Sequence, residues 1–392
     1  MGELGESIIG LTYKPTDVKS DGWLVLRSSN VQDGWLAFED NVYVDADVPK
    51  RLVVREGDIL VCVRNGSRPL IGKCALIIGN PKNTTFGAFM AVYRSRYGHY
   101  IFQQFQSDLI KRQIHEHLGA TINQITNASL NSFEVPFPDE ETERAVIAQA
   151  LFDTDELIRT IEKLIAKKRN IKQAAMQQLL TGKKRLPGFT GDWQPTPLSK
   201  LGTTYGGLTG KTKADFGSGN ARYIPFLNVL NNTVIDAKVL DRVSIGTREA
   251  QNEVRGGDLF FNGSSETPED LGLCSVLDLN LKGVYLNSFC FGFRPYVVGS
   301  FNGLFLAYYF RSRPGRELLY SLAQGATRYN LSKTALLRVE LPMPLVEEQD
   351  AIASTLSDMS AEIDMLEARR DKTHAIKLAM MQQLLTGKVR LV

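Results

Sequence analysis

MQQLLTGKKRL (176–186) and MQQLLTGKVRL (381–391) are the same eleven-residue phrase, written twice with a single mismatch. Extended backwards, residues 143–186 align without a gap with residues 348–391, and 21 of the 44 positions are identical. Weaker matches continue towards the start of each copy. A period of about 200 residues is too long for a solenoid unit, so the sequence predicts a duplicated domain that carries an appendage.

The appendage of each copy reads as a long helix. Residues 143–181 contain neither Pro nor Gly, and apolar residues recur at alternating steps of four and three. That alternation is typical of a coiled-coil seam. Its members are Ile147, Leu151, Thr154, Ile158 and Ile161 in the first copy and Ile352, Leu356, Met359, Ile363 and Leu366 in the second. Because neither helix can bury its stripe alone, we expect each to pack against its repeat.

The other parts of each copy read as mixed α/β domains. Short β-rich runs alternate with Gly, Asn and Pro turns, and a helix is expected near 100–117 and near 304–322. REGDILV (55–61) faces RGGDLFF (255–261), and the loops between such framework runs differ. The expected boundaries are a domain at 1–138, a helix at 139–186, a second domain at 187–344 and a second helix at 345–392.

Composition and motifs indicate a non-catalytic protein. The chain has 392 residues and a net charge of +3, with no signal peptide or long apolar run, so a cytoplasmic location is expected. The loop 206–212 lacks the first glycine of a phosphate-binding loop, because Tyr205 stands in its place. His115 and His117 point to different faces of a helix, which favours a surface position over a metal site. Cys62, Cys74, Cys274 and Cys290 form no close pair and are expected to be buried thiols.

Polar and basic loops are the candidate binding sites. Arginine and asparagine side chains have the donor and acceptor geometry that reads guanine and adenine edges. Asn65-Gly66-Ser67 has a counterpart in Asn262-Gly263-Ser264, although an Asn-Gly pair is also common in β-turns. The predicted DNA-contacting residues are Arg64, Asn65, Ser67, Arg68, Lys82, Asn83, Arg94 and Arg96 in the first copy and Lys211, Lys213, Arg222, Asn262, Ser264, Arg294 and Arg328 in the second.

The repeated helix end is a candidate docking surface. A helix end with a glycine cap explains Leu179, Leu180, Gly182 and Lys183, but not why two glutamines recur unchanged. A surface that occurs twice suits two copies of one partner. The predicted docking residues are Gln177, Gln178, Leu179, Leu180, Gln382, Gln383, Leu384 and Leu385.

These features resemble the specificity subunits of type I restriction–modification systems. The resemblance rests on two divergent domains, each followed by a Pro-terminated strand (136–138, 342–344), an acidic helix start and a helix ending in QQLLTGK. The GAT runs at Gly119 and Gly325 also fit. One departure is the start: the second copy opens with GDWQPTPLSKLG, whereas the first begins at Met1-Gly2-Glu3-Leu4. Either the helical end of the second copy supports that edge, or the sequence begins too late.

The resemblance implies an α+β protein with two target-recognition domains in a pseudo-two-fold arrangement, separated by two antiparallel coiled-coil helices. Each domain would read one half of a split, asymmetric site in double-stranded DNA. Two methyltransferase subunits would dock, with S-adenosylmethionine, and restriction subunits would add ATP and Mg²⁺ chemistry, so this chain would hold no cofactor. Two alternatives remain open: a scaffold whose domains bind other ligands, and an enzyme that uses the loop 206–212.

Overall fold

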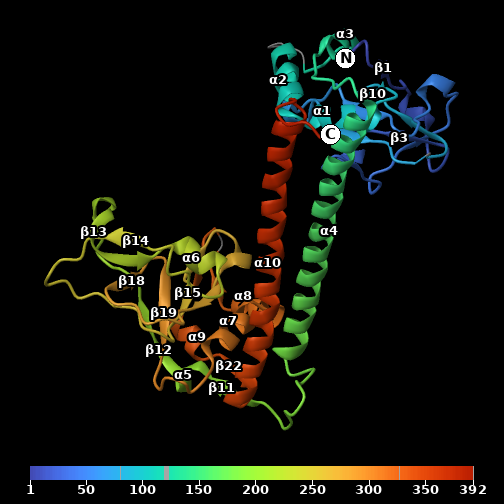
Figure 1. Ribbon diagram of the computed structural model, residues 1–392. Coiled ribbons are helices and arrows are strands. Elements are labelled where there is room, and N and C mark those ends of the chain that lie inside the picture. The colour runs from blue at the N-terminus through green and yellow to red at the C-terminus, as the bar shows by residue number, and fades with distance from the viewer. Residues whose placement is uncertain (80, 119–122, 326, 392) are drawn as a thin grey trace. The chain divides into compact units, whose positions relative to one another are not determined.

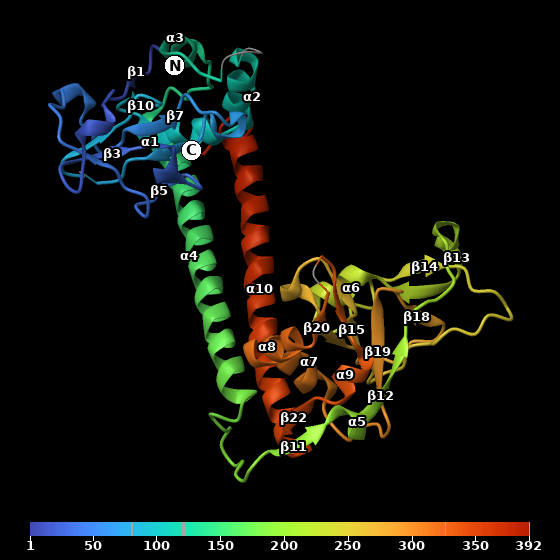
Figure 2. The ribbon, with the colours of Figure 1, turned by 180° about the vertical axis from the view of Figure 1, so that it is seen from behind.

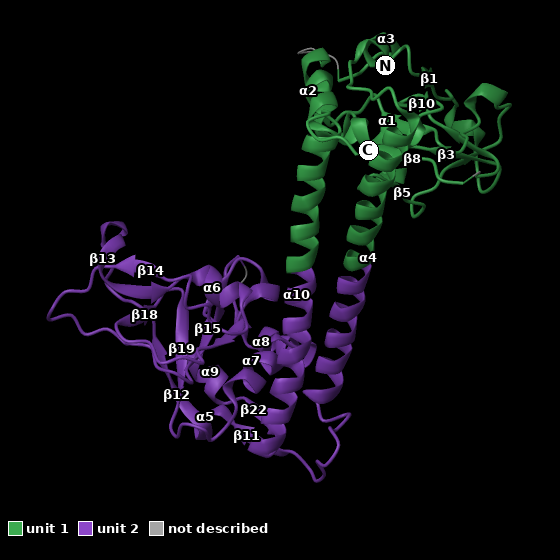
Figure 3. Cartoon of the chain, viewed as in Figure 1, with its two compact units in different colours: residues 1–162, 368–392 green, residues 163–367 purple. Residues whose placement is uncertain are grey.

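The computed structural model describes residues 1–79, 81–118, 123–325 and 327–391. Its two compact units are unit 1, formed by Met1–Glu162 with Ala368–Val392, and unit 2, formed by Lys163–Glu367 (Figure 3). Each unit contains one of the predicted domains together with a segment of both long helices. The compact units therefore combine segments that are far apart in the sequence, and the four expected domain boundaries stay predictions.

The domain of unit 1 is built on two small sheets and three helices. The first sheet is antiparallel, in the order β1 (Glu6–Ile9), β10 (Met90–Arg94), β7 (Ile59–Cys62) and β8 (Cys74–Leu76). The second is mixed, in the order β2 (Val18–Lys19), β6 (Tyr43–Val44), β3 (Trp23–Leu26) and β9 (Thr84–Phe86). A hairpin joins β4 (Val31–Gln32) to β5 (Trp35–Leu36), and the helices are α1 (Gly98–Gln106), α2 (Asp108–His117) and α3 (Asn127–Ser132).

Unit 2 repeats this plan. Its antiparallel sheet has the order β12 (Gly202–Gly206), β19 (Cys290–Pro295), β15 (Leu259–Asn262) and β17 (Cys274–Val276). Smaller sheets join β14 (Asp241–Val243), β13 (Phe216–Ile224) and β18 (Val284–Leu286), then β16 (Ser264–Ser265), β21 (Tyr329–Leu331) and β20 (Ala323–Gln324), then β11 (Gln194–Pro197) and β22 (Glu340–Met343). The helices are α5 (Leu198–Leu201), α6 (Phe226–Asn231), α7 (Gly303–Arg311), α8 (Arg313–Ser321) and α9 (Lys333–Leu337). Figures 1 and 2 show α7 and α8 between the sheet and α10.

Short 3₁₀ turns complete the connections. They span Pro15–Asp17, Ser28–Asn30, Lys50–Leu52 and Arg68–Leu70 in unit 1 and Lys213–Asp215 and Pro268–Asp270 in unit 2. With the sheets and helices above, they make the two mixed α/β domains that the sequence predicts.

The two long helices are α4 (Glu141–Leu179) and α10 (Val346–Leu384). Glu141 and Glu143 occupy the first turn of α4, where acidic side chains favour the positive end of the helix dipole. Both helices end before a glycine with positive φ, +68° at Gly182 and +71° at Gly387, a conformation that only glycine adopts without strain. The predicted caps are confirmed.

The predicted seam is buried for most of its length. Ile147, Leu151, Ile158 and Ile161 of α4 and Ile352, Leu356 and Ile363 of α10 are buried. Thr154, Met359 and Leu366 are only partly buried. Ion pairs show an antiparallel pairing in each unit, because higher numbers in and after α4 are matched to lower numbers in and after α10. The pairs are Glu143–Arg390 and Asp155–Lys377 in unit 1, and Arg169–Glu367 and Arg185–Glu348 in unit 2. None of the described helices is long and apolar enough to cross a membrane.

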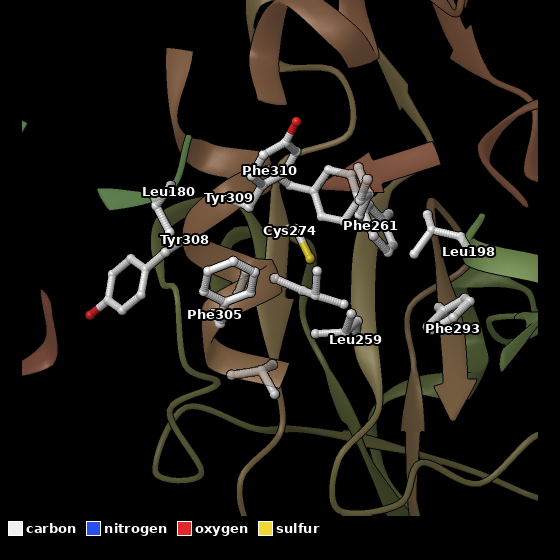
Figure 4. Packing of buried hydrophobic residues seen from close by; sticks show 14 of the residues in the cluster. Leu180, Leu198, Leu259, Phe261, Cys274, Phe293, Phe305, Tyr308, Tyr309 and Phe310 are labelled. Atoms are coloured by element: carbon white, nitrogen blue, oxygen red, sulfur yellow. The ribbon is translucent and has the colours of Figure 1, made fainter. Parts of the chain in front are cut away.

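Each helix ends in a hydrophobic core. In unit 2, Leu179 and Leu180 belong to the hydrophobic core that also contains Phe261, Phe305 and Phe310 of the sheet and of α7. Figure 4 shows part of this core, including Leu180. In unit 1 the corresponding place is taken by Leu384 and Leu385 of α10, which join the core formed around β7, β10 and α1. The end of each copy's helix therefore completes the core of the other copy's domain.

The strand register fixes how the two domains correspond. In unit 1, Cys62 at the end of β7 lies opposite Met90; in unit 2, Asn262 at the end of β15 lies opposite Cys290. Corresponding residues of the two copies thus differ by 200 in residue number in this sheet, and Asn262 occupies the position that Cys62 has in unit 1. Matching Asn65-Gly66-Ser67 with Asn262-Gly263-Ser264 was therefore wrong by three positions, because one motif follows the strand and the other begins within it.

Candidate nucleic-acid interface

The turn after β7 carries the predicted residues 64–68. The side chain of Asn65 accepts a hydrogen bond from the backbone N–H of Ser67 (2.9 Å), so this amide stabilises the turn. Arg64 and Arg68 are exposed on either side of it. One guanidinium nitrogen of Arg68 donates to the backbone carbonyl of Leu118 (3.2 Å), and the rest of the group faces solvent. The turn presents two cations within a few residues.

The other predicted residues of unit 1 lie elsewhere. Lys82 and Asn83 are exposed and precede β9, and Asn83 has a left-handed backbone with φ of +49°. Arg96 is exposed and follows β10, with its guanidinium 4.5 Å from the centre of the Tyr97 ring. Arg96 follows the end of β10 that lies away from the turn at 64–68, and Lys82 and Asn83 lie before a strand of the other sheet. Although these residues are close to the turn at 64–68 in the sequence, they do not form one cluster with it.

Arg94 and Arg294 belong to the framework of the domains. Arg94 donates two hydrogen bonds to the carboxylate of Asp58 (2.8 and 2.7 Å), and Arg294 does the same with Asp258 (2.9 and 2.6 Å). The side chains of Asp58 and Asp258 are 2% and 1% exposed, and the bonds to them raise the pKa of both guanidiniums. Removing an arginine would leave a buried charge unpaired. The two arginines are therefore withdrawn from the DNA-contacting set.

The residues predicted in unit 2 also differ in exposure. Lys213, Arg222 and Arg328 are exposed, and Ser264 is half-buried. The ammonium of Lys211 instead bonds the backbone carbonyl of Ser244 (2.7 Å) and the carboxylate of Glu249 (2.5 Å), and its side chain is only 7% exposed. The bond from Lys211 lowers the pKa of Glu249 to about 2. An ammonium held in this way is not available to a phosphate.

Asn262 is also withdrawn from the DNA-contacting set. Its side chain is fully buried at the end of β15, where it donates to the carbonyl of Asp270 (2.8 Å) and accepts from the N–H of Ser264 (3.2 Å). Two internal hydrogen bonds and full burial give it the same kind of role that Asn65 has in its turn. It shapes the loop that follows the strand.

The predicted docking residues divide into two groups. Gln177, Gln178, Gln382 and Gln383 are exposed on the last turn of their helices. Leu179, Leu180, Leu384 and Leu385 are between 0% and 6% exposed, so they anchor the helix ends in the cores and cannot form a docking surface. A hollow of about 420 Å³ lies beside Gln382 and is also lined by Gln104, Asp108 and Arg112.

Other sequence predictions were tested by burial. All four cysteines are free and buried, as predicted, and burial raises the pKa of Cys74 and of Cys290 to about 12. His115 and His117 are exposed on α2, which agrees with a surface position. Among the described residues there is no group of three or more His, Cys, Asp or Glu that could hold a metal ion. Gly119 of the first GAT run lies outside the described residues; Gly325 of the second has a φ of +110°.

Residues 191–373 match a family described as the type I restriction modification DNA specificity domain. The putative type I restriction enzyme MjaX specificity subunit of Methanocaldococcus jannaschii is 24% identical over 97% of this chain and 90% of its own length. The EcoKI specificity subunit of Escherichia coli K12 is 26% identical over 69% of this chain and 61% of its own.

Solved structures share the fold. The S subunit of a type I restriction–modification system from M. genitalium superposes with a TM-score of 0.59 at 13% identity, over 98% of this chain and 94% of that one. A chain from a structure of a type I restriction–modification system superposes with a TM-score of 0.57 at 18% identity, over 99% and 97%. The chain is therefore similar to specificity subunits of type I restriction–modification systems over nearly its whole length, and its residues 191–373 match the DNA specificity domain of that family.

Proposed function

We propose that the chain reads a split, asymmetric site in double-stranded DNA, with one half-site contacted by each unit. A contrast within the duplication supports this division. The buried pairs Asp58–Arg94 and Asp258–Arg294 recur, whereas the loops that carry exposed cations differ between the copies. Identical domains would read identical half-sites, and diverged domains on one framework suit two different sequences.

We propose further that the two helix ends dock two copies of a methyltransferase subunit, and through them the restriction subunits. The exposed pairs Gln177-Gln178 and Gln382-Gln383 present the same side chains twice, which suits two copies of one partner. S-adenosylmethionine, ATP and Mg²⁺ then belong to the partner subunits, and this chain is non-catalytic and acts in the cytoplasm with the cell's DNA. A net charge of only +3 fits an assembly in which partners supply part of the phosphate contacts.

The observation that carries the proposal is the divergence of exposed basic loops on a repeated framework. Its test compares the purified chain, alone and with its partner subunits, on a library of randomised duplexes. The complete complex should select two fixed words separated by a fixed gap, and only the complex should transfer methyl groups. Methyl transfer by the isolated chain, or a complex that selects no sequence, would contradict the proposal.

Docking has a separate test in the stoichiometry of the complex. Gln177→Ala with Gln178→Ala should remove one methyltransferase copy, and Gln382→Ala with Gln383→Ala the other, as measured by native mass spectrometry. Asn170→Ala is the matched control, because Asn170 is also exposed on α4 but is replaced by Ala375 in the second copy. Unchanged stoichiometry in both double variants would show that the partner docks elsewhere.

A further inference from the structure

Phe89 and Phe289 occupy the same place in the two domains, at the offset of 200 that the strand register gives. Each stands in a turn just before the strand that it introduces, β10 or β19. Their side chains are 60% and 55% exposed. Large aromatic side chains usually have most of their surface buried. Phe289 has an aromatic neighbour in Phe226, with 6.4 Å between the ring centres, but more than half of each phenylalanine is open to solvent. Packing alone therefore does not explain why both copies carry a phenylalanine here.

The backbone of these residues does not explain the recurrence either. The carbonyl of Phe89 accepts hydrogen bonds from the N–H groups of Val63 and Arg64 (3.1 Å each), and that of Phe289 accepts one from Gly263 (3.0 Å). Any residue type offers this carbonyl. The backbone therefore does not require phenylalanine, and the role of this residue in both copies lies in its aromatic side chain.

An arginine lies over each ring. The guanidinium carbon of Arg64 is 5.2 Å from the centre of the Phe89 ring, and that of Arg328 is 5.8 Å from the centre of the Phe289 ring. Both distances are within the range of a cation–π contact. Each arginine is exposed, so the guanidinium is held on one face and open to solvent on the other side.

The two arginines reach the rings from different segments. Arg64 lies opposite Gln124 in an antiparallel bridge, and Ser264, the residue at the corresponding place in unit 2, lies opposite Asn330. Arg328 comes from the segment that contains Asn330, and it also donates to the hydroxyl of Ser264 (3.4 Å). The arginine therefore comes from a different segment in each copy. In both copies its guanidinium lies over the phenylalanine at the corresponding position.

We propose that Phe89 and Phe289 are positioning residues, each of which holds an arginine ready to bind a guanine edge in the major groove of one half-site. This inference rests on the proposed function. An exposed arginine samples many rotamers, and ordering it on binding lowers affinity. A ring beneath the flat face of the guanidinium restricts those rotamers and leaves the edge with the N–H fork free. That fork matches the O6 and N7 acceptors of guanine.

Polar side chains lie near each of the two phenylalanine–arginine pairs. In unit 1, the amide of Asn65 donates to the hydroxyl of Ser28 (3.4 Å) beside the Arg64 turn. In unit 2, Phe289 and Arg328 line a hollow of about 440 Å³ together with Ser265, Glu266 and Thr267. In unit 2, the hydroxyl and carboxylate groups beside Arg328 can form hydrogen bonds with a base, whereas in unit 1 the Asn65 amide is used within its own turn. This difference between the units is what two different DNA words require.

The test is a double-mutant cycle in the complete complex with its partner subunits. Duplexes carrying the site selected from a randomised library are compared with duplexes in which single base pairs are changed. Phe89→Ala should lower discrimination about 5- to 10-fold at one G·C pair of one half-site, since a bidentate contact at that pair depends on the arginine geometry. Phe89→Ala combined with Arg64→Ala should lose no more than Arg64→Ala alone. Phe289→Ala with Arg328→Ala should behave alike in the other half-site.

Two variants separate positioning from folding. Phe89→Trp keeps an aromatic face and should retain discrimination, whereas Phe89→Leu keeps an apolar side chain and should lose it. Ile78→Ala, at a side chain of the same domain that is 49% exposed, is the control and should leave discrimination unchanged. Additive losses in the double variant, or equal losses in both half-sites, would overturn the inference. A wild-type complex that selects no sequence would instead overturn the proposed function, and that result is obtained first.

Discussion

The guanidinium of Arg390, in the segment after α10, donates hydrogen bonds to both carboxylate oxygens of Glu143 in the first turn of α4. The same pair recurs in unit 2, where Arg185, after α4, donates to both oxygens of Glu348 in the first turn of α10. The two arginines are 205 positions apart in the sequence, and so are the two glutamates. Each helix end is therefore tied to the start of the other helix. The leucines at the helix ends also pack in the domain of the other copy. Each unit is therefore built from parts of both copies.

This exchange predicts where core mutations act. Leu385 belongs to the second copy's helix but is 1% exposed in the core of unit 1, and Leu180 of the first copy is fully buried in unit 2. Leu385→Ala should lower the free energy of unfolding of unit 1 by about 2–5 kcal/mol, and Leu180→Ala that of unit 2, because a cavity remains. Hydrogen exchange resolved by peptide measures the two units separately.

Leu378→Ala is the matched control for this prediction, since Leu378 lies on the same helix as Leu385 and is 54% exposed. It should change exchange in neither unit by more than a small amount. If Leu385→Ala accelerated exchange in unit 2 and left unit 1 unchanged, the assignment of the helix ends to the cores would be wrong.

The Glu143–Arg390 pair predicts a dependence of stability on pH. The hydrogen bond from Arg390 lowers the pKa of Glu143 below its ordinary value of 4.5. A carboxyl with a lowered pKa in the folded state stabilises that state above its ordinary pKa, and this contribution is lost as the pH falls through the folded value. Wild type should therefore melt at a higher temperature than Glu143→Gln at pH 7, and the two should converge below pH 4.5. A difference that stays constant down to pH 3 would exclude this linkage.

The helix pair predicts the gap between the half-sites. Ion pairs join α4 to α10 in both units, so the length of both helices must change together. Four residues inserted after Leu164 and four after Arg369, close to the unit boundaries, add about 6 Å to each helix while nearly restoring its rotation. The selected DNA site should keep its two words and gain one or two base pairs of gap, at about 3.4 Å per base pair.

The control for the insertion is a pair of two-residue inserts at the same positions. Two residues turn the following helix by about 200°, which places the seam on the wrong face and should prevent assembly. A stable four-residue variant whose selected gap is unchanged would show that the helices do not set the spacing.

The duplication made much of this structure predictable. The helices, their glycine caps and the buried seam follow from periodicity and from the repeated phrase, because these features depend on local sequence. Arg94 and Arg294 were assigned to DNA because the sequence does not show which carboxylate pairs with an arginine. In the structure each arginine pairs with an aspartate 36 residues earlier in the chain. That equal spacing in the two copies was a signal of a framework pair. The leucines of the helix ends were misassigned for a related reason, since the core that buries them belongs to the other copy's domain.

Separate reading of two half-sites is tested most directly by site selection with one arginine variant in each unit. Arg64→Ala in unit 1 and Arg222→Ala in unit 2 are introduced singly into the complete complex, and each complex selects from the same randomised duplex library. We expect Arg64→Ala to weaken preference in one word and Arg222→Ala in the other, by about 1–3 kcal/mol at the base pairs concerned, with the gap and the remaining word unchanged. A variant that weakened both words equally would contradict the assignment of one half-site to each unit.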